Sequence, residues 1–464
     1  MIAIYKKDTF DPRFSGEKFR LSRTGRCAWH PGRGYCNCGY FMVSLMYKLK
    51  YRVSARIGGT PLLMRTTRKN NTMKRSVFIV AAQRTPIGNF GGALSTVPAT
   101  QLGAQAARAA LGQSGIAGAE VDELLMGCVL QAGVGQAPAR QVSTYAGLPD
   151  TVPATTINKV CASGMKAVAL GAQAILLGDA DVVLAGGMEN MSQVPYYAPA
   201  VRWGAKYGNQ SLVDGLQYDG LCDAYNREAM GSFGEQCAAY YHIDRQAQDA
   251  YAVTSYTRAQ EAWTKGKFRA EVVPVTVTGK KGEHTVQQDE EFSLLDPAKV
   301  PQLKPAFKPE GTITAANSST LSDGAACLLM ASGEKVKALG LTPLAEVIAF
   351  ADAEQTPEWF TTTPARATEK VLAKAGLSLS EIDFFEFNEA FAVVALVNTH
   401  LLKLPHDKVN VYGGAVSLGH PLGCSGARIL VTLTSVLRQE GGHYGLAAIC
   451  NGGGGASAMI IRKV

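Results

Sequence analysis

The strongest constraint on how this chain folds is an internal repeat. VDELLMGC, which begins at residue 121, aligns with IDFFEFNE, which begins at residue 382, at an offset of 261. In CASGMKAVALG and CSGARILVTL, Ser163 and Gly164 fall on Ser425 and Gly426 at an offset of 262. The segment DVVLAGGMEN then falls near GLAAICNGGG. Three blocks at a nearly constant offset predict duplication of a whole αβ unit, with two similar but unrelated units as the alternative.

Strands and helices alternate along the chain. SVFIVAAQRTPIG reads as a buried strand that enters a turn, and QLGAQAARAALGQSG as a helix that ends at glycine. This alternation predicts an α/β layered fold. Residues 190–319 are richer in Tyr, Gln, Asp and Lys, and we interpret them as an inserted loop domain. The predicted halves of the core are therefore residues 74–189 with 320–342, and residues 343–464.

The excess positive charge lies in an N-terminal extension. Residues 1–75 hold 17 Lys and Arg against 3 Asp and Glu, whereas the rest of the chain holds 29 basic and 35 acidic residues. We place residues 1–73 outside the fold and interpret the acid-free stretch from Met46 as a mitochondrial import signal. A cytoplasmic location is the alternative if translation starts at Met73. A basic arm is also compatible with nucleic-acid or membrane-surface binding, but we expect no nucleic-acid partner.

The rest of the composition excludes some classes of protein. No window contains eighteen uninterrupted apolar residues, so we expect no membrane span. Seven cysteines are scattered through the long domain without a framework, which is typical of free thiols in a reducing compartment. The C-terminal IIRKV is not a peroxisomal address of the SKL type.

Four loops carry reactive side chains. They hold Cys161 in NKVCASG, Asn388 in FNEAFA, His420 in SLGHPLG and Cys450 in ICNGGGG. A lone cysteine is more often a small buried apolar residue than a nucleophile. Loops that follow equivalent strands of two packed repeats can meet, however, and a helix N-terminus with an imidazole would lower the pKa of the Cys161 thiol. The glycine backbone from Gly452 onward would leave N–H groups free for an oxyanion.

Two cysteines and a histidine without a metal point to acyl transfer. One thiolate can carry an acyl group as a thioester, and the second can remove a proton from a carbon next to a carbonyl. The product is a carbon–carbon bond that is formed or broken by Claisen chemistry. A disulfide redox pair is the competing interpretation, but the two cysteines lie in separate loops without CxxC spacing.

Seven segments together resemble the thiolase family across residues 75–464, in order and without a large gap. They are QRTPIGNFGGAL, GCVLQAGVGQAPARQ, NKVCASGMKA, AGGMENMSQVPY, NEAFA, GGAVSLGHPLGCSGAR and CNGGGGASAM. The resemblance implies the thiolase fold, a duplicated αβαβα core with an inserted loop domain. Among thiolases the chain is most similar to the mitochondrial type of acetyl-CoA C-acetyltransferase, through LCDAYNREAMGS and TAANSSTLSDGAA. The implied reaction is 2 acetyl-CoA ⇌ acetoacetyl-CoA + coenzyme A.

The resemblance also implies a role for each catalytic residue. Cys161 would carry the acyl group, and His420 would activate it. Cys450 would exchange the α-proton of the second acetyl-CoA. One oxyanion hole would consist of His420 and, through a water, Asn388. The other would consist of the backbone N–H groups of Cys161 and Gly452.

Further ligand residues follow from the same resemblance. The implied coenzyme A contacts are Leu221, Tyr225, Met230, Lys299, Val300, Pro301, Lys304, Phe307, Ser319, Ala390 and Phe391. A potassium ion would bind near Tyr225, Ala315, Ala316, Ser318 and Val416, where Ser318 replaces an alanine of the pattern. Ala229 stands where a histidine is common, which bears on affinity and on a branched 2-methyl substrate. No tightly bound cofactor is expected, and the chain is expected to form a homodimer or homotetramer.

Three alternatives remain open at this point. A longer-chain 3-ketoacyl-CoA thiolase of β-oxidation would differ in its chain-length profile. A ketoacyl synthase would show a histidine or an asparagine in place of Cys450. A catalytically silent lipid or RNA binder that uses the basic arm would lack thiolysis activity after truncation at Met73.

Overall fold

The computed structural model describes residues 75–279 and 282–464. The predicted extension, residues 1–73, and its targeting signal lie outside the described residues. The main strands are β1 (Val77–Arg84), β3 (Glu123–Gly127), β4 (Ala154–Ile157), β5 (Val182–Asn190), β10 (Ser322–Ser332), β11 (Ala345–Glu354), β12 (Phe384–Phe387), β13 (Tyr444–Asn451) and β14 (Gly455–Lys463). The helices of the core are α2 (Ala99–Ser114), α3 (Pro138–Ala146), α4 (Ser163–Leu177), α7 (Gly333–Ala338), α8 (Thr363–Ala375), α9 (Ala392–Leu402), α10 (Ala415–Leu418) and α11 (Leu422–Gln439).

The strand pairing contains the predicted duplication. The order is β12-β13-β14-β11-β1-β10-β5-β3-β4, with the two-residue strand β2 (Gly88–Asn89) paired to β10. Leu124 of β3 pairs in parallel with Leu184 of β5, and Phe385 of β12 pairs in parallel with Leu446 of β13. These two pairs are related by the offsets of 261 and 262 found in the sequence. The duplication is therefore confirmed down to the register of the strands.

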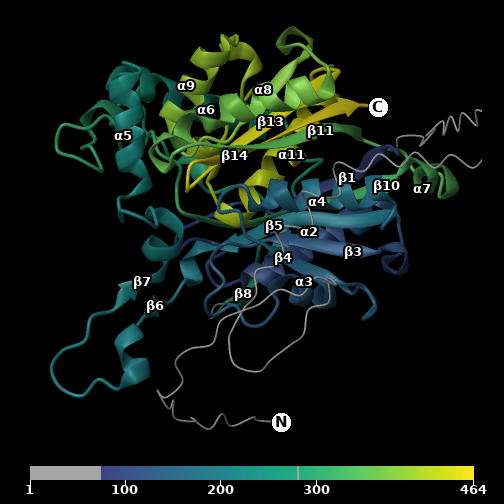
Figure 1. Ribbon diagram of the computed structural model, residues 1–464, viewed down its shortest axis with the longest axis horizontal. Helices are drawn as coiled ribbons and strands as arrows, with labels where there is room; N and C mark the ends of the chain where they lie inside the picture. The colour runs from purple at the N-terminus through teal and green to yellow at the C-terminus, as the bar shows by residue number, and fades with distance from the viewer. Residues whose placement is uncertain (1–74, 280–281) are drawn as a thin grey trace, which may run out of the picture. The chain divides into compact units, whose positions relative to one another are not determined.

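The two half-sheets join through a short ladder between β1 and β11. Phe78 pairs with Glu346, and Ile79 pairs with Ala345. Through this ladder, hydrogen bonds connect all ten strands into one sheet. Its two halves diverge in space, and the helices α4 and α11 lie between them (Figure 1). The layers are α2 with α3, the first half-sheet, α4 with α11, the second half-sheet, and α8, which is the expected αβαβα order.

The central helices approach each other closely at glycine. A Cβ atom on Gly164 would lie 2.8 Å from the backbone nitrogen of Ala427, and one on Gly426 would lie 2.5 Å from that of Met165. Both distances are shorter than real Cβ contacts allow. The two glycines that the repeat aligns thus permit the same contact from each helix, and this packing places the loops before α4 and α11 side by side.

One apolar helix meets the length criterion for a membrane span. Among the described residues, the stretch Val160–Leu177 has a mean hydropathy of 1.6 over 18 residues. This stretch contains α4, whose apolar side chains pack against β5 and α11 in the middle layer. Its position between two half-sheets accounts for its composition.

The inserted segment contains more regular structure than a loop. It carries α5 (Met230–Tyr240) and α6 (Arg245–Thr264), which lie beside the second half of the core in Figure 1. Two short hairpins complete it, β6 (Tyr196–Tyr197) with β7 (Val213–Asp214) and β8 (Val275–Gly279) with β9 (Gly282–Val286). The division of the chain at residues 190–319 stays a prediction.

A buried ion cluster attaches the inserted segment to β1. Arg84 is fully buried and donates to both carboxylate oxygens of Asp289, at 2.7 and 3.0 Å, and to Glu271 at 2.7 Å. Asp289 also accepts from the backbone N–H of Ile87 at 2.8 Å and from Trp263 Nε1 at 3.1 Å. A buried guanidinium needs these partners, since removal of one leaves an uncompensated charge.

We predict that Asp289→Ala lowers the free energy of unfolding by about 3 to 5 kcal/mol, because Arg84 loses a bidentate partner in a buried setting. Urea or guanidinium titration of the purified protein measures the change. As a control, Glu261→Ala removes an exposed i,i+4 partner of Lys265 on α6 and should leave the transition where it is. Equal midpoints for Asp289→Ala and the unchanged chain would contradict this account of the cluster.

Candidate active site

The loop before α4 holds Cys161 in a strained conformation. Val160, the preceding residue, has φ = 46°, a region that β-branched residues rarely occupy. Asn158 Oδ1 accepts from the backbone N–H of Val160 at 3.0 Å, and Ser163 Oγ donates to the carbonyl of Val160 at 2.5 Å. Cys161 is half-buried and precedes the first helical residue by two positions. Local hydrogen bonds thus fix the direction in which the thiol points.

His420 lies at the equivalent place before α11 and is fixed by Ser425. The Ser425 hydroxyl donates to the carbonyl of Pro421 at 2.9 Å and lies 2.6 Å from His420 Nδ1. A hydroxyl that gives its single hydrogen to Pro421 can only accept from Nδ1, and on this basis we assign the hydrogen of the His420 ring to Nδ1. The lone pair of His420 is therefore on Nε2, 3.5 Å from Asn388 Nδ2. This tautomer suits a general base.

Burial keeps both partners of the pair neutral at rest. Burial raises the pKa of the Cys161 thiol to about 12, although the backbone N–H groups of Gly452 and Cys161 lower it. Burial lowers the pKa of His420 to about 3, and the cation of Arg428 lowers it further. The expectation that the helix N-terminus lowers the pKa of Cys161 is therefore wrong. The thiol loses its proton only as it reacts.

The second cysteine and the glycine loop lie next to Cys161. Cys450 is the penultimate residue of β13 and is 1% exposed, and burial together with nearby Cys161 raises the pKa of its thiol well above the usual value. Gly452 follows two residues later, and its backbone N–H lies close enough to Cys161 to lower the pKa of that thiol. Asn388, just after β12, is buried, and its Oδ1 has no protein partner among the described residues. All five predicted catalytic residues thus occupy one region.

A cavity of about 260 Å³ opens onto this region. Cys161, His420 and Gly452 line it, whereas Cys450 lies outside its lining. Of the predicted coenzyme A contacts, six line the same cavity: Leu221, Met230, Phe307, Ser319, Ala390 and Phe391. Ala229, the departure from the pattern, also lines it. Five predicted contacts lie outside the lining of this cavity: Tyr225, Lys299, Val300, Pro301 and Lys304.

The predicted contacts outside the cavity differ in exposure. Tyr225 is 82% exposed, and the ammonium of Lys299 lies 3.1 Å from Asp296. Pro301 and Lys304 are exposed, while Val300 is buried. The exposed lysines are compatible with the phosphate end of a long ligand whose acyl end enters the cavity.

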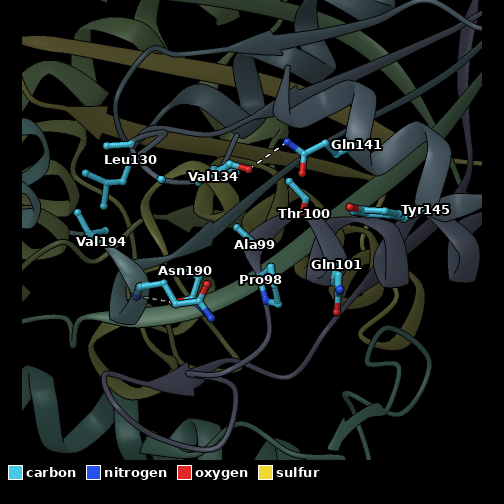
Figure 2. Close-up of a pocket in the computed structure, with 13 residues that line it drawn as sticks. Pro98, Ala99, Thr100, Gln101, Leu130, Val134, Gln141, Tyr145, Asn190 and Val194 are labelled. Atoms are coloured by element: carbon cyan, nitrogen blue, oxygen red, sulfur yellow. Dashed lines mark hydrogen bonds between the residues drawn. The ribbon is translucent and has the colours of Figure 1, made fainter. Parts of the chain in front are cut away.

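A different cavity of about 240 Å³ contains none of the predicted catalytic residues (Figure 2). Its lining includes Pro98, Gln101 and Tyr145, with Gln141 donating from its amide to the carbonyl of Val134 at 3.0 Å. Part of it comes from GCVLQAGVGQAPARQ, one of the seven segments by which the sequence resembles thiolases. Leu130 of its lining belongs to the apolar cluster against which Cys161 packs, so this cavity lies next to the catalytic loops.

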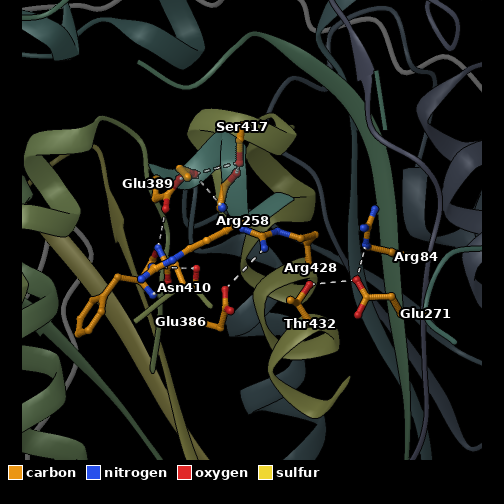
Figure 3. A network of polar contacts seen from close by, with 12 residues as sticks. Arg84, Arg258, Glu271, Glu386, Glu389, Asn410, Ser417, Arg428 and Thr432 are labelled. Atoms are coloured by element: carbon orange, nitrogen blue, oxygen red, sulfur yellow. Dashed lines mark hydrogen bonds and ion pairs between the residues drawn. The ribbon is translucent and has the colours of Figure 1, made fainter. Parts of the chain in front are cut away.

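A buried polar network lies around α11 and β12 (Figure 3). Glu389 accepts from Asn410 Nδ2 at 2.8 Å. Arg428 lies 3.7 Å from Glu386, and both side chains are 1% exposed. Burial raises the pKa of Glu386 to about 8, while Arg428 lowers it. The cation of Arg428 contributes to keeping His420 neutral.

The residues predicted for potassium have mixed surroundings. Ala316 and Val416 are buried, Ala315 and Tyr225 are exposed, and Ser318 is half-buried. The Ser318 hydroxyl donates to the carbonyl of Thr314 at 2.7 Å, so the change from alanine leaves the carbonyl of Ser318 available. Carbonyl oxygens are suitable ligands for K⁺. Within the described residues no cluster of His, Cys, Asp and Glu could hold another metal.

Sequence reasoning missed several residues of the site. Met191, Leu422 and Phe360 line the cavity, and Ser425 fixes the tautomer of His420. Ser425 is inside the quoted motif GGAVSLGHPLGCSGAR, and its spacing of five residues from His420 was the available signal. Phe360 has no such signal, because it comes from a short helix far along the chain.

Comparison with known proteins identifies the class. Residues 77–334 match the thiolase N-terminal domain, and residues 341–463 match the thiolase C-terminal domain. An acetyl-CoA acetyltransferase of Schizosaccharomyces pombe is 52% identical over 390 residues, which are 84% of this chain and 99% of that protein. Acetyl-CoA acetyltransferase 2 of Arabidopsis thaliana is 53% identical over 391 residues, 84% of this chain and 97% of its own.

A solved structure supports the same assignment to the thiolases. The crystal structure of Acat5 thiolase from Ascaris suum in complex with coenzyme A matches with a TM-score of 0.80 and 45% identity, covering 84% of this chain and 100% of that chain. The chain belongs to the thiolase family.

We predict that Ser425→Ala slows acetylation of the protein by acetyl-CoA about 10²-fold, because His420 loses the acceptor that keeps its lone pair on Nε2. Ser425→Thr, which keeps the hydroxyl, should retain most of the rate. Ser435→Ala, farther along α11, serves as the control. Rapid-quench experiments measure the rate at which acetyl-enzyme forms. An unchanged rate in Ser425→Ala would show that another group sets the tautomer of His420.

Proposed function

We propose that this site condenses two molecules of acetyl-CoA to acetoacetyl-CoA and coenzyme A, and runs the reverse thiolysis. The chain is an acyltransferase, and it acts as an acetyl-CoA acetyltransferase like the relatives described above. The observation that carries the mechanism is the meeting of Cys161, His420 and the Gly452 N–H at one cavity, with Cys450 beside them. The route has two chemical steps.

In the first step, Cys161 Sγ attacks the thioester carbonyl while His420 Nε2 takes its proton. The backbone N–H groups of Cys161 and Gly452 stabilise the tetrahedral oxyanion. The bond to coenzyme A then breaks, and the departing thiolate takes the proton of Cys450. Because burial keeps Cys450 protonated at rest, this transfer is what makes its thiolate. Acetyl-Cys161, an imidazolium and the Cys450 thiolate remain.

In the second step, the Cys450 thiolate removes a proton from the methyl group of the next acetyl-CoA. The carbanion attacks the acetyl carbonyl on Cys161, and the Cys161 thiolate leaves and takes the proton from His420. Asn388 supports the enolate oxygen through a water, and its buried Oδ1 without a protein partner supports such a role. Both thiols and the neutral imidazole are restored, so the protons balance.

We predict that Cys161→Ala abolishes formation of acetyl-enzyme, because the thiol that carries the acetyl group is removed. Cys450→Ala should still accept one acetyl group but lose condensation by more than about 10³-fold, since no base remains for the α-proton. Radiolabelled acetyl-CoA and a coupled condensation assay measure the two steps. Stoichiometric acetylation of the Cys161→Ala protein would overturn the assignment.

A longer-chain 3-ketoacyl-CoA thiolase is the second candidate in the same fold. The apolar lining from Met230, Phe307 and Phe391 is what favours considering it. Thiolysis rates on acetoacetyl-CoA and on longer 3-ketoacyl-CoA substrates separate the two. A 2-methyl substrate tests the effect of Ala229, which leaves more room than a histidine would.

A potassium site is also part of the proposal. Carbonyl oxygens near Ala315, Ala316, Ser318 and Val416 would hold the ion, and the ion would order the loop that carries Ser319 to the cavity. We predict higher activity and a higher melting temperature in KCl than in NaCl at equal ionic strength. Equal values in the two salts would contradict the site.

Assembly and location complete the proposal. The arm between β6 and β7 exposes large apolar side chains, with Trp203 86% and Tyr207 99% exposed, as expected for a face that contacts another copy. Light scattering distinguishes monomer, dimer and tetramer. Mitochondrial import through the basic extension is tested by cell fractionation and by the mass of the mature N-terminus. A cytosolic location is the alternative, and a relative of 50% identity from Gibberella zeae is named as cytosolic.

A further inference from the structure

We propose that Lys159 is a positioning residue that acts through Asn451 to hold the Gly452 N–H against Cys161. The inference rests on the proposed function, since Gly452 matters only if an oxyanion develops beside Cys161. It assigns a task to two side chains that belong to opposite halves of the core. Neither residue touches the reacting atoms.

Lys159 reaches from the Cys161 loop to the other half. Its Nζ donates to Asn451 Oδ1 at 3.0 Å and to Glu354 Oε1 at 2.9 Å, and the Lys159 side chain is only 18% exposed. Its own backbone N–H donates to Ser163 Oγ at 2.8 Å, the hydroxyl that also holds the strained Val160. Lys159 is therefore held by hydrogen bonds both at its backbone N–H and at its side-chain ammonium.

Asn451 passes this restraint to the donor. Its side chain is 5% exposed, accepts from Lys159, and donates through Nδ2 to the carbonyl of Gly452 at 2.8 Å. A Cβ on Gly452 would lie 3.4 Å from Met230 Sδ and 3.7 Å from Val160 Cγ1, so Gly452 lies against both side chains. The carbonyl that Asn451 binds belongs to the next peptide, Gly452–Gly453, so this hydrogen bond spans the Asn451–Gly452 peptide, whose N–H lies near Cys161, and restrains its rotation.

An ordinary ion pair explains less of this geometry. Glu354 is 58% exposed, and an exposed carboxylate contributes little to stability. Asp352 lies farther away, at 4.0 Å, so the two shortest contacts of Lys159 Nζ are with Glu354 and with the buried amide of Asn451. The bond to Asn451 is the contact that connects Lys159 to the site.

The internal repeat supplies an independent parallel. Asn451 corresponds to Glu189 at the offset of 262; Asn451 is the last residue of β13, and Glu189 is the penultimate residue of β5. Glu189 accepts from the backbone N–H of Gly423, at the start of α11, at 2.8 Å, and from those of Val129 and Leu130. At the same position of each repeat, then, a polar side chain fastens the catalytic loop of the opposite half.

The test is a double-mutant cycle in thiolysis of acetoacetyl-CoA with the full chain. Lys159→Met and Asn451→Leu should each lower kcat about tenfold, a fraction of the effect of deleting an oxyanion donor, and leave KM for both substrates unchanged. The double variant should lose no more than either single variant, because both changes break one tether. Lys159→Arg, which keeps the charge and the donors, should restore most of kcat.

Lys166→Met is the matched control. Lys166 lies on α4 and pairs at 2.7 Å with Asp352 of β11, whose other carboxylate oxygen lies 4.0 Å from Lys159. Lys166→Met therefore removes a neighbouring charge and leaves the bond from Lys159 to Asn451 in place, so kcat should not change. Unchanged kcat in both single variants, or losses that multiply in the double variant, would overturn the proposal. If Lys159→Met fails to fold, Asn451→Leu tests the same tether. An unmodified chain without thiolysis would refute the proposed function instead.

Discussion

The site depends on the close contact between α4 and α11. Gly164 and Gly426 let the two helices approach until a methyl group on either would collide with the backbone of the other. Cys161 precedes the first helix by two residues, and His420 precedes the second by the same number. The contact between α4 and α11, which buries both helices between the half-sheets, therefore also brings Cys161 and His420 to one cavity. Wider helix spacing would separate them without changing either loop.

Burial sets the chemistry of this arrangement. Burial raises the pKa of the Cys161 thiol to about 12 and lowers that of the His420 imidazole to about 3, which favours a neutral pair over an ion pair. Fixed donors then decide the rate, because they stabilise charge only where it develops. This is why side chains that orient donors, such as Ser425 for His420 and Asn451 for Gly452, matter as much as the reacting atoms.

Much of this could be predicted from the sequence. The repeat gave the fold class, and Cys161, His420 and Cys450 were each recognisable at a strand or helix junction next to glycine. The raised pKa of Cys161 was not predicted, because burial depends on the opposite half of the core. The cluster of Arg84 with Asp289 was missed for the same reason, since it joins residues 205 positions apart through side chains with no local pattern.

The central claim is that acyl transfer passes through Cys161 in a site shared by both halves. Peptide mapping of the unmodified chain after brief incubation with acetyl-CoA tests it most directly. The account predicts one acetyl group per chain, on the peptide that contains Cys161, and its removal by added coenzyme A. The account would be contradicted if the acetyl group were found on another peptide, or if added coenzyme A did not remove it.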